Sequence, residues 1–538
     1  MPVTVTYPGI YIEEIPSSTH TIAAAPTNIA VFIGYTHPFK TPKTQFGKAI
    51  LLFSFTDYER NFGGFFDSPI FSPAKPKPTD AVDNFFGNLP LAVNQFFLNG
   101  GTMCYVVGLE AKFEGEPLDP GSADIGGITF TARELTDSTH EMRVAITPTG
   151  VSPTSPPTSP VSATEADIVI TYGSGTGAIV EVYRQVKLSE IETRIGTGTK
   201  AVSSLVTVKP TSGSLPTSYP PKTDKVLSGV TGVPPLIAPD FLDVLEDDSS
   251  LDKVSIFNLM VLPGVTSSTV LSRVLDFCER KRAFLIMDPP PPPDDDATLP
   301  RDAYFQLVEN QIGTKAPLAP NTAIYFPYIK SNNPQTGEPI ELPPAGTVAG
   351  IFARTDLNRG VWKAPAGLET TILGTTGVVP AGEMSDRRQG TLNQIAVNCL
   401  RSFPGAGTVV FGARTSVGAD ANTSQQQWKY VPVRRMTLFL EQTLYNNLGW
   451  VVFEPNDEPL WTAIRTSIEA FMLGLFRQGA FQGSKPSEAF QVKCDNQTTT
   501  QADIDNGKVN IVVAFAPLKP AEFVIIKIAQ LAGQTQTA

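Results

Sequence analysis

The segment from residue 254 to residue 288 constrains the fold of this chain most, because it reads as a strand, a helix and a second strand in close succession. Residues 254–262 (VSIFNLMVL) and 284–287 (FLIM) are short apolar runs typical of buried strands. Between them, after Ser267 or Ser268 as a suitable N-cap, apolar residues recur at helical spacing: Val270, Leu271, Val274, Leu275 and Cys278. A unit of this length predicts a right-handed crossover joining two parallel strands, and hence a mixed α/β fold.

Composition and charge narrow the class of protein further. A chain of 538 residues is long enough for three or four domains of roughly 150 residues each. Its net charge of −11 argues against a nucleic-acid partner, because such binders need surplus Lys and Arg to neutralise phosphates. No run approaches the roughly 18 apolar residues of a spanning helix, so we expect no membrane insertion. The start of the chain does not resemble a signal peptide, and its four cysteines are widely spaced, which indicates free thiols and assembly in the cytoplasm.

Residues 111–232 differ in composition from their surroundings, because Thr, Ser, Pro and Gly dominate them. Short β-prone runs occur there at residues 128–131, 142–146, 168–172 and 179–183, and residues 147–164 are suited only to a loop. We predict an inserted, surface-facing β-rich outer domain at 111–232. Residues 31–110 and 233–430 on either side of it form the middle α/β domain.

Residues 431–520 predict a C-terminal α+β domain. The pattern favours helices at 434–448 and 457–478, the second capped by Asn456, with a strand at 450–453 between them. Residues 489–494 and 509–515 are further strands that can pair as a hairpin with a long loop.

Both ends of the chain are strand-forming segments outside these domains. In the N-terminal arm (residues 1–30), Val3, Val5 and Tyr7 alternate with Thr4 and Thr6, and Ile10 and Ile12 follow a turn. The C-terminal arm (residues 521–538) contains a second β-prone run: Phe523, Val524, Ile525, Ile526 and Ile528. An extended segment cannot satisfy its own backbone hydrogen bonds, so each arm must pair with a sheet. Two such ends suit assembly by β-strand addition between copies.

The sequence contains no catalytic, cofactor or metal signature. His20, His37 and His140 lie in no zinc-binding or catalytic motif, and we interpret all three as surface residues. GSGTG (173–177) and GTGTK (196–200) fit turns better than phosphate-binding loops. Asp288 follows a predicted parallel strand, where catalytic carboxylates often lie, but no nucleophile or histidine accompanies it. We therefore predict that the chain is not an enzyme and holds no cofactor.

Several segments together resemble contractile tail sheath proteins, in the order that this family shows. The opening segment TYPGIYIEEIPSSTHTIAAAPTNIAVFIGYT carries the resemblance first. The later segments are 96–109, 348–367, 398–415, 430–461 and 500–528. The resemblance implies a sheath subunit with a subtilisin-like α/β middle domain and a tube-proximal C-terminal domain. It also implies a six-start helical polymer of stacked hexameric rings, which surrounds an inner tube protein and meets baseplate and terminal cap proteins. The sequence shows no Ser/His/Asp catalytic triad, so the subtilisin-like comparison concerns the fold and not the activity.

The resemblance also implies roles for particular residues. The arms would add strands to neighbouring subunits at Val3–Tyr7, extended through Ile12, and at residues 523–528. The acceptor hairpin would contain Phe490, Val492, Val509, Ile511 and Val513. Candidates for contact with the tube are Arg434, Arg435, Arg465 and Arg477.

Other functions are also compatible with the sequence. A capsid or adhesin component would share the turn-rich composition without needing strands at both ends, and a subtilisin-like serine hydrolase would need a nucleophile paired with histidine. Within the sheath family, a phage tail, an extracellular injection particle and a bacteriocin are all compatible with the sequence.

Overall fold

The computed structural model describes residues 20–66, 89–113, 116–118, 120–136, 141–149, 163–198, 200–227, 238–293, 302–314, 318–335 and 337–528. They divide into two compact units. The C-terminal unit combines the described parts of 1–25 and 427–538 with Asn358–Ala364, and the larger unit contains 26–357 and 365–426. The predicted strand residues between Val3 and Ile12 lie outside the described residues. No helix among the described residues is long and apolar enough to cross a membrane.

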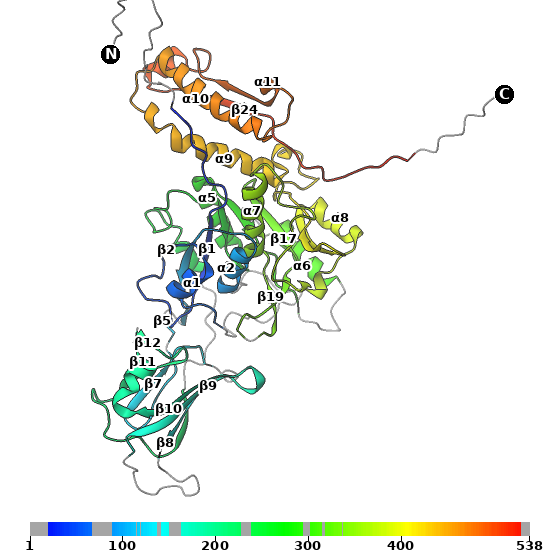
Figure 1. Cartoon of the computed structure of the whole chain (residues 1–538). Helices are drawn as coiled ribbons and strands as arrows, with labels where there is room; N and C mark the ends of the chain where they lie inside the picture. The colour runs from blue at the N-terminus through cyan, green and yellow to red at the C-terminus, as the bar shows by residue number, and fades with distance from the viewer. Residues whose placement is uncertain are drawn as a thin grey trace, which may run out of the picture. The chain divides into compact units, whose positions relative to one another are not determined.

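An eight-stranded sheet organises the larger unit (Figure 1). Its strands, in spatial order, are β2 (Ala49–Leu52), β3 (Cys104–Leu109), β1 (Ala30–Tyr35), β15 (Leu259–Val261), β16 (Phe284–Met287), β17 (Thr322–Phe326), β21 (Val397–Phe403) and β22 (Gly407–Val410). The two outermost strands are antiparallel to their neighbours, and the six inner strands are parallel. The predicted parallel pair is therefore confirmed, although its first strand begins at Leu259 rather than at residue 254.

The helix of the predicted crossover is α5 (Ser268–Lys281), which begins after an extended Ser267 and ends at a left-handed Arg282. All five apolar residues of its predicted stripe are buried. The other helices of this unit are α1 (Phe55–Phe62), α2 (Leu89–Leu98), α4 (Ala238–Asp243), α6 (Ala303–Thr314), α7 (Ala345–Arg359) and α8 (Asp386–Gln394). Its short strands β18 (Ile329–Asn332), β19 (Pro339–Leu342) and β20 (Gly377–Val378) form a small separate sheet.

Helices α2 and α7 pack closely through two glycines of α7. A Cβ atom at Gly346 or Gly350 would lie 2.6 Å from the carbonyl oxygens of Ala92 and Phe96, respectively. Any larger side chain at these positions would force the two helices apart.

Residues 122–227 form two antiparallel sheets around a core of their own. The first contains β10 (Ile179–Lys187), β9 (Glu165–Tyr172), β8 (Met142–Pro148) and β14 (Thr223–Leu227), and the second β13 (Val206–Pro210), β7 (Ile128–Ala132) and β6 (Ser122–Asp124). Smaller elements are α3 (Ile191–Ile195) and the pairs β4 (Lys112–Phe113) with β5 (Glu116–Pro117) and β11 (Gly196–Thr197) with β12 (Lys200–Ala201). Burial alternates along β8 and β9, as expected for sheets with one face packed. The four predicted strands of this region are all present.

The C-terminal unit packs two long helices, α9 (Val431–Asn447) and α10 (Glu458–Arg477), against a two-stranded sheet. The strands are β23 (Phe490–Lys493) and β24 (Val512–Phe515), and short helices α11 (Pro486–Ala489) and α12 (Gln501–Asp505) flank the first of them. The predicted strand at 450–453 is wrong: residues 449–451 form a 3₁₀ turn. The predicted cap Asn456 is also wrong, because the Asp457 side chain accepts from the Leu460 N–H instead.

Candidate assembly interface

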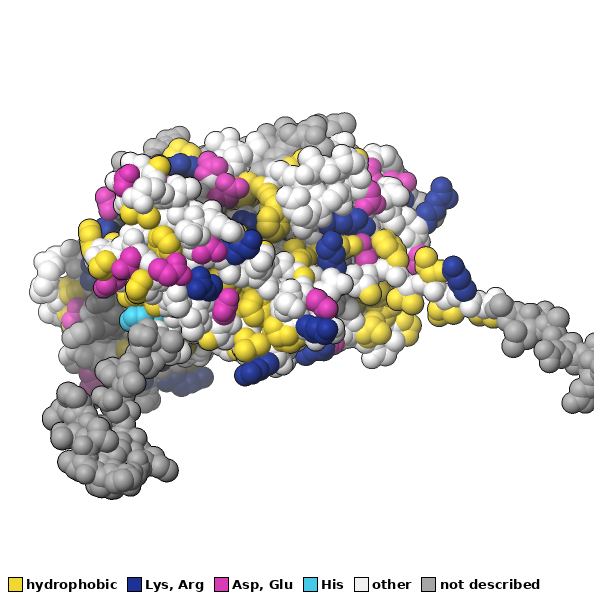
Figure 2. Space-filling view, turned by 90° about the horizontal axis from the view of Figure 1, so that it is seen from above, with side chains coloured by type: hydrophobic (Ala, Val, Ile, Leu, Met, Phe, Trp, Pro, Cys, Tyr) yellow, Lys and Arg dark blue, Asp and Glu magenta, His cyan; other side chains and the backbone are white. Residues whose placement is uncertain are grey.

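The C-terminal segment, residues 523–528, is extended and belongs to no sheet of the described chain. Its apolar side chains are largely exposed, from 72% for Phe523 to 93% for Ile528. The segment runs out from the body of the molecule with hydrophobic and basic side chains along it (Figure 2). A hydrogen bond of 3.1 Å from the Tyr430 hydroxyl to the Glu522 carboxylate ties down its base. A contiguous apolar surface of this kind marks a site of interaction with another chain.

The predicted hairpin between β23 and β24 is confirmed. Its antiparallel register pairs Phe490 with Phe515 and Val492 with Val513. Val492 is buried against the core that α10 contributes to, whereas Val512 is half exposed. Val509 and Ile511, which were predicted to lie in the second strand, precede it and pack against the same core. No further strand joins this sheet among the residues that the structure describes, so each of its two edges has backbone groups that can accept another strand.

The base of the N-terminal arm is fixed on the C-terminal end of α9. The His20 ring stacks on Trp450 with ring centroids 3.9 Å apart, and Ile22 is buried in the core of this unit. The Asn447 side chain forms a pair of hydrogen bonds, of 2.9 and 2.8 Å, with the backbone of Ala23. The arm therefore starts beside α9, and its predicted strands before His20 lie outside the described residues.

The four arginines predicted to face a tube differ in their surroundings. Arg435 is only 4% exposed, and Arg434 lies over the Trp428 ring and 3.6 Å from Glu441. Arg465 donates to the carbonyl oxygen of Cys494 at 2.8 Å, which ties α10 to the end of β23. Arg477 is exposed in the last turn of α10. Arg477 is therefore the most exposed arginine of this set, and the Arg465 side chain is 29% exposed.

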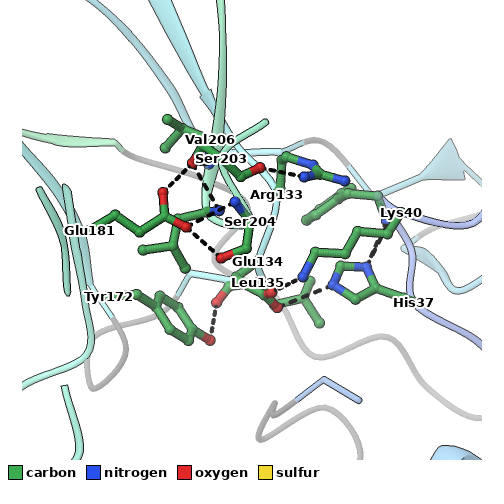
Figure 3. A network of polar contacts seen from close by, with 12 residues as sticks. His37, Lys40, Arg133, Glu134, Leu135, Tyr172, Glu181, Ser203, Ser204 and Val206 are labelled. Carbon is green, nitrogen blue, oxygen red and sulfur yellow. Dashed lines mark hydrogen bonds and ion pairs between the residues drawn. The ribbon is translucent and has the colours of Figure 1, made fainter. Parts of the chain in front are cut away.

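His37 is buried, so its interpretation as a surface residue is wrong (Figure 3). Its Nδ1 accepts backbone N–H bonds from Phe39 and Lys40, both at 3.2 Å, so the proton must be on Nε2. That nitrogen donates to Glu134 at 3.1 Å, while Lys40 pairs with the other carboxylate oxygen. Burial lowers the pKa of His37, which keeps the ring neutral. His20 is exposed, as predicted, and His140 lies outside the described residues.

A second cluster of hydrogen-bonded polar side chains lies next to His37 and Glu134 (Figure 3). Ser203 and Ser204 donate through their hydroxyls to Glu181, both at 2.5 Å, and Arg133 donates to the carbonyl oxygen of Ser203, also at 2.5 Å. Burial tends to raise the pKa of Glu181, but these hydrogen bonds outweigh it and lower the pKa. The serines are thus committed to a structural carboxylate, and neither has a histidine partner in the network.

Asp288 is buried at the end of β16 and accepts two backbone N–H bonds, from Gly264 at 2.8 Å and from Ala345 at 2.6 Å. Its carboxyl group therefore occupies the N-terminus of α7, the position that binds anions in many α/β proteins. Burial raises its pKa to about 7. This residue joins the loop at Gly264 and the first residue of α7 to the sheet. Within the described residues, no cluster of His, Cys, Asp or Glu is arranged to hold a metal ion.

We expect replacement of Asp288 by Ala to destabilise the larger unit by about 1–3 kcal/mol, because the backbone N–H groups of Gly264 and Ala345 would lose their acceptor. The loss should be larger near pH 4 than near pH 8. The folded-state pKa lies above the usual 3.8, so the wild-type residue loses its stabilising contribution as pH rises toward about 7. Urea unfolding of both proteins at several pH values measures this difference. A gap that widens with rising pH would contradict the assignment.

Comparison with known proteins assigns the family. The family model for the phage tail sheath central domain matches residues 247–416, and the model for the phage tail sheath C-terminal domain matches residues 423–530. The tail sheath protein of Vibrio phage KVP40 is 25% identical over 34% of this chain. A putative prophage major tail sheath protein of Pseudomonas aeruginosa is 27% identical over 51% of it. These matches span 26% and 65% of the relatives' own lengths.

Solved structures share the fold over almost the whole chain. The contracted PVC sheath of an extracellular contractile injection system is similar at a TM-score of 0.56 and 22% identity, covering 98% of this chain and 99% of that one. A sheath tail protein from Desulfitobacterium hafniense is similar at a TM-score of 0.52 and 12% identity, covering 95% of this chain and all of that one. On the two domain matches, this mixed α/β chain belongs to the phage tail sheath family.

Proposed function

We propose that the chain is the structural subunit of a contractile sheath. Copies polymerise as a helical stack of hexameric rings around an inner tube, between baseplate and cap proteins, after assembly in the bacterial cytoplasm. Contraction then drives the tube through a target envelope. The observation that carries this proposal is the exposed, unpaired C-terminal segment beside a hairpin with open edges. Contraction needs no chemical step. The polar side chains of the contacts described above form hydrogen bonds and ion pairs within the subunit, which fits a structural role.

Strand exchange explains how such a polymer forms. The C-terminal segment of one copy and the N-terminal arm of another add to the β23–β24 hairpin of a third, giving a four-stranded sheet. Each backbone hydrogen bond contributes only about 0.5–1.5 kcal/mol net, but the contact is repeated at every subunit. Extended linkers also let subunits rotate while the strands stay paired. The subunit interfaces can then repack from one arrangement into another, and this repacking releases the stored free energy.

The same proposal gives each of the other domains a position in the sheath. The middle domain, with its largely parallel sheet, is the subtilisin-like part of the subunit without a catalytic set. The region 111–232 is the outer domain, and 431–520 is the domain next to the tube, where Arg477 is the foremost candidate for contact with it.

Electron microscopy of the purified chain tests the function, since a sheath subunit should form striated hollow tubes. Removal of residues 1–15 should prevent ordered tubes, because the N-terminal strands are lost, while the fixed base from His20 onward keeps the C-terminal unit folded. Circular dichroism checks folding, and sedimentation measures assembly. Ordered tubes from the truncated chain would overturn the role of the arm, whereas particles of any other form from the full chain would overturn the sheath itself.

A further inference from the structure

The turn between α9 and α10 has a backbone that its sequence does not favour. The N–H of Glu454 bonds to the carbonyl oxygen of Val451 at 3.2 Å, which closes a four-residue turn. Val452 has φ −70° and ψ 128°, and Phe453 has φ 72°. These angles define a type II turn, whose third position normally holds glycine because φ is positive there. A phenylalanine in that position is strained.

The two residues at the tip of the turn are also exposed. Val452 is 62% exposed and the Phe453 side chain is fully exposed. Residues on both sides are held in place: Val451 packs against the core, and Asn456 bonds to the Lys508 carbonyl oxygen at 2.9 Å and to Trp461 Nε1 at 2.8 Å. The turn is therefore a fixed projection. Strain and apolar exposure at the same residue are both unfavourable in the isolated subunit, and such sites are typical of contacts made with a partner.

The position of the turn indicates which partner. Trp450, two residues before the tip of the turn, stacks on His20 in the base of the N-terminal arm. The bond from Asn456 to Lys508 connects the turn to the loop that leads into β24. The turn thus lies between the arm and the hairpin, the two parts that the proposed function assigns to contacts between copies.

Charge around the turn fits the same partner. Glu454, Asp457 and Glu458 follow its apolar tip closely in the sequence and are exposed. The C-terminal segment carries the complementary chemistry, since its exposed apolar run contains Lys527 and follows the exposed Lys519. Opposite charges around an apolar contact favour the correct partner and register.

We propose that the Val452–Phe453 turn is a contact with a second copy of this chain, with Phe453 inserting into an apolar site bordered by basic side chains. The proposal rests on the proposed function and adds a residue-level anchor outside the strand pairing. Fully exposed aromatic residues on a rigid support are the usual anchors of such interfaces.

Replacement of Phe453 by Gly separates this contact from a structural role. Because glycine suits the turn, F453G should raise the melting temperature of the unassembled subunit by about 1–3 °C. It should also raise the critical concentration for assembly at least tenfold. Phe453→Asn, which tolerates positive φ, should show the same loss of assembly. The matched control is Val202→Ser in the region 111–232, where Val202 is 64% exposed, and it should assemble normally.

These experiments distinguish failure of the Phe453 contact from failure of the proposed sheath function. If the wild-type chain forms no sheath, the proposed function fails. If the wild type forms sheaths and both Phe453 variants assemble equally well, the turn is not an anchor. A photo-crosslinking amino acid at position 453 should join two copies in sheaths of the chain alone. A crosslink that appears only with an inner tube protein would overturn the choice of partner.

Discussion

Truncation after Glu522 should abolish assembly of the chain into ordered tubes and leave the melting temperature of the subunit within about 1 °C of the wild-type value. Residues 523–528 pair with no strand of the described chain, and their apolar side chains are 72–93% exposed, so their loss removes little packing within the subunit. The truncation keeps the bond between Tyr430 and Glu522. Sedimentation and electron microscopy measure assembly, and calorimetry measures stability.

A single substitution makes the same test without shortening the chain. Ile526→Pro removes a backbone donor from the middle of the added strand, which a paired strand does not tolerate. Its matched control is Gln534→Pro, beyond the C-terminal segment, which should assemble like the wild type. Ordered tubes formed by the truncated chain and by I526P would show that the segment does not link the copies.

Replacement of Glu134 by Ala should destabilise the larger unit by about 3–5 kcal/mol, because it leaves the Lys40 ammonium unpaired and the buried His37 without its acceptor. Burial tends to raise the pKa of Glu134, but His37 and Lys40 outweigh it and lower the pKa below its usual 4.5. The stabilisation is therefore present above about pH 4.5 and lost as pH falls through the lower folded-state value. Denaturant unfolding at pH 7 and at pH 3–4 measures both effects.

Two other glutamate variants control this experiment. Glu134→Gln keeps an acceptor for His37 but loses the charge opposite Lys40, so its loss of stability should be intermediate. Glu141→Ala breaks an exposed pair with Arg143 in the same inserted region and should leave the stability close to that of the wild type, because water and salt screen such a pair. A loss of less than 1 kcal/mol for E134A would mean that the buried contact of Glu134 with His37 and Lys40 does not stabilise the larger unit.

Local sequence patterns predicted the elements that depend on neighbouring residues. The α5 stripe and the parallel pair beside it follow from spacing over about thirty residues, and of the two serines proposed as the N-cap the helix begins after Ser267. The hairpin of β23 and β24 follows from two β-prone runs in a C-terminal region of the right length. In each case the signal and the structure lie within one short stretch of chain.

The missed features depend on partners far away in the sequence. His37 appeared to lie in an exposed turn, because its partner Glu134 is 97 residues away in the inserted region. The apolar run 450–453 predicted a strand, but Trp450 stacks on His20 and the chain turns sharply at Phe453. No pattern of spacing reveals either contact. A positive φ at a phenylalanine is likewise invisible in the sequence, because glycine is the usual signal for it.

The most direct measurement is a cryo-electron microscopy map of the assembled wild-type polymer in which the chain can be traced from Glu522 to Ile528. The proposed assembly predicts that this segment lies along a β23–β24 hairpin of a different copy, continuing its sheet. A map in which each segment lies on the hairpin of its own subunit, with no strand crossing between copies, would contradict it.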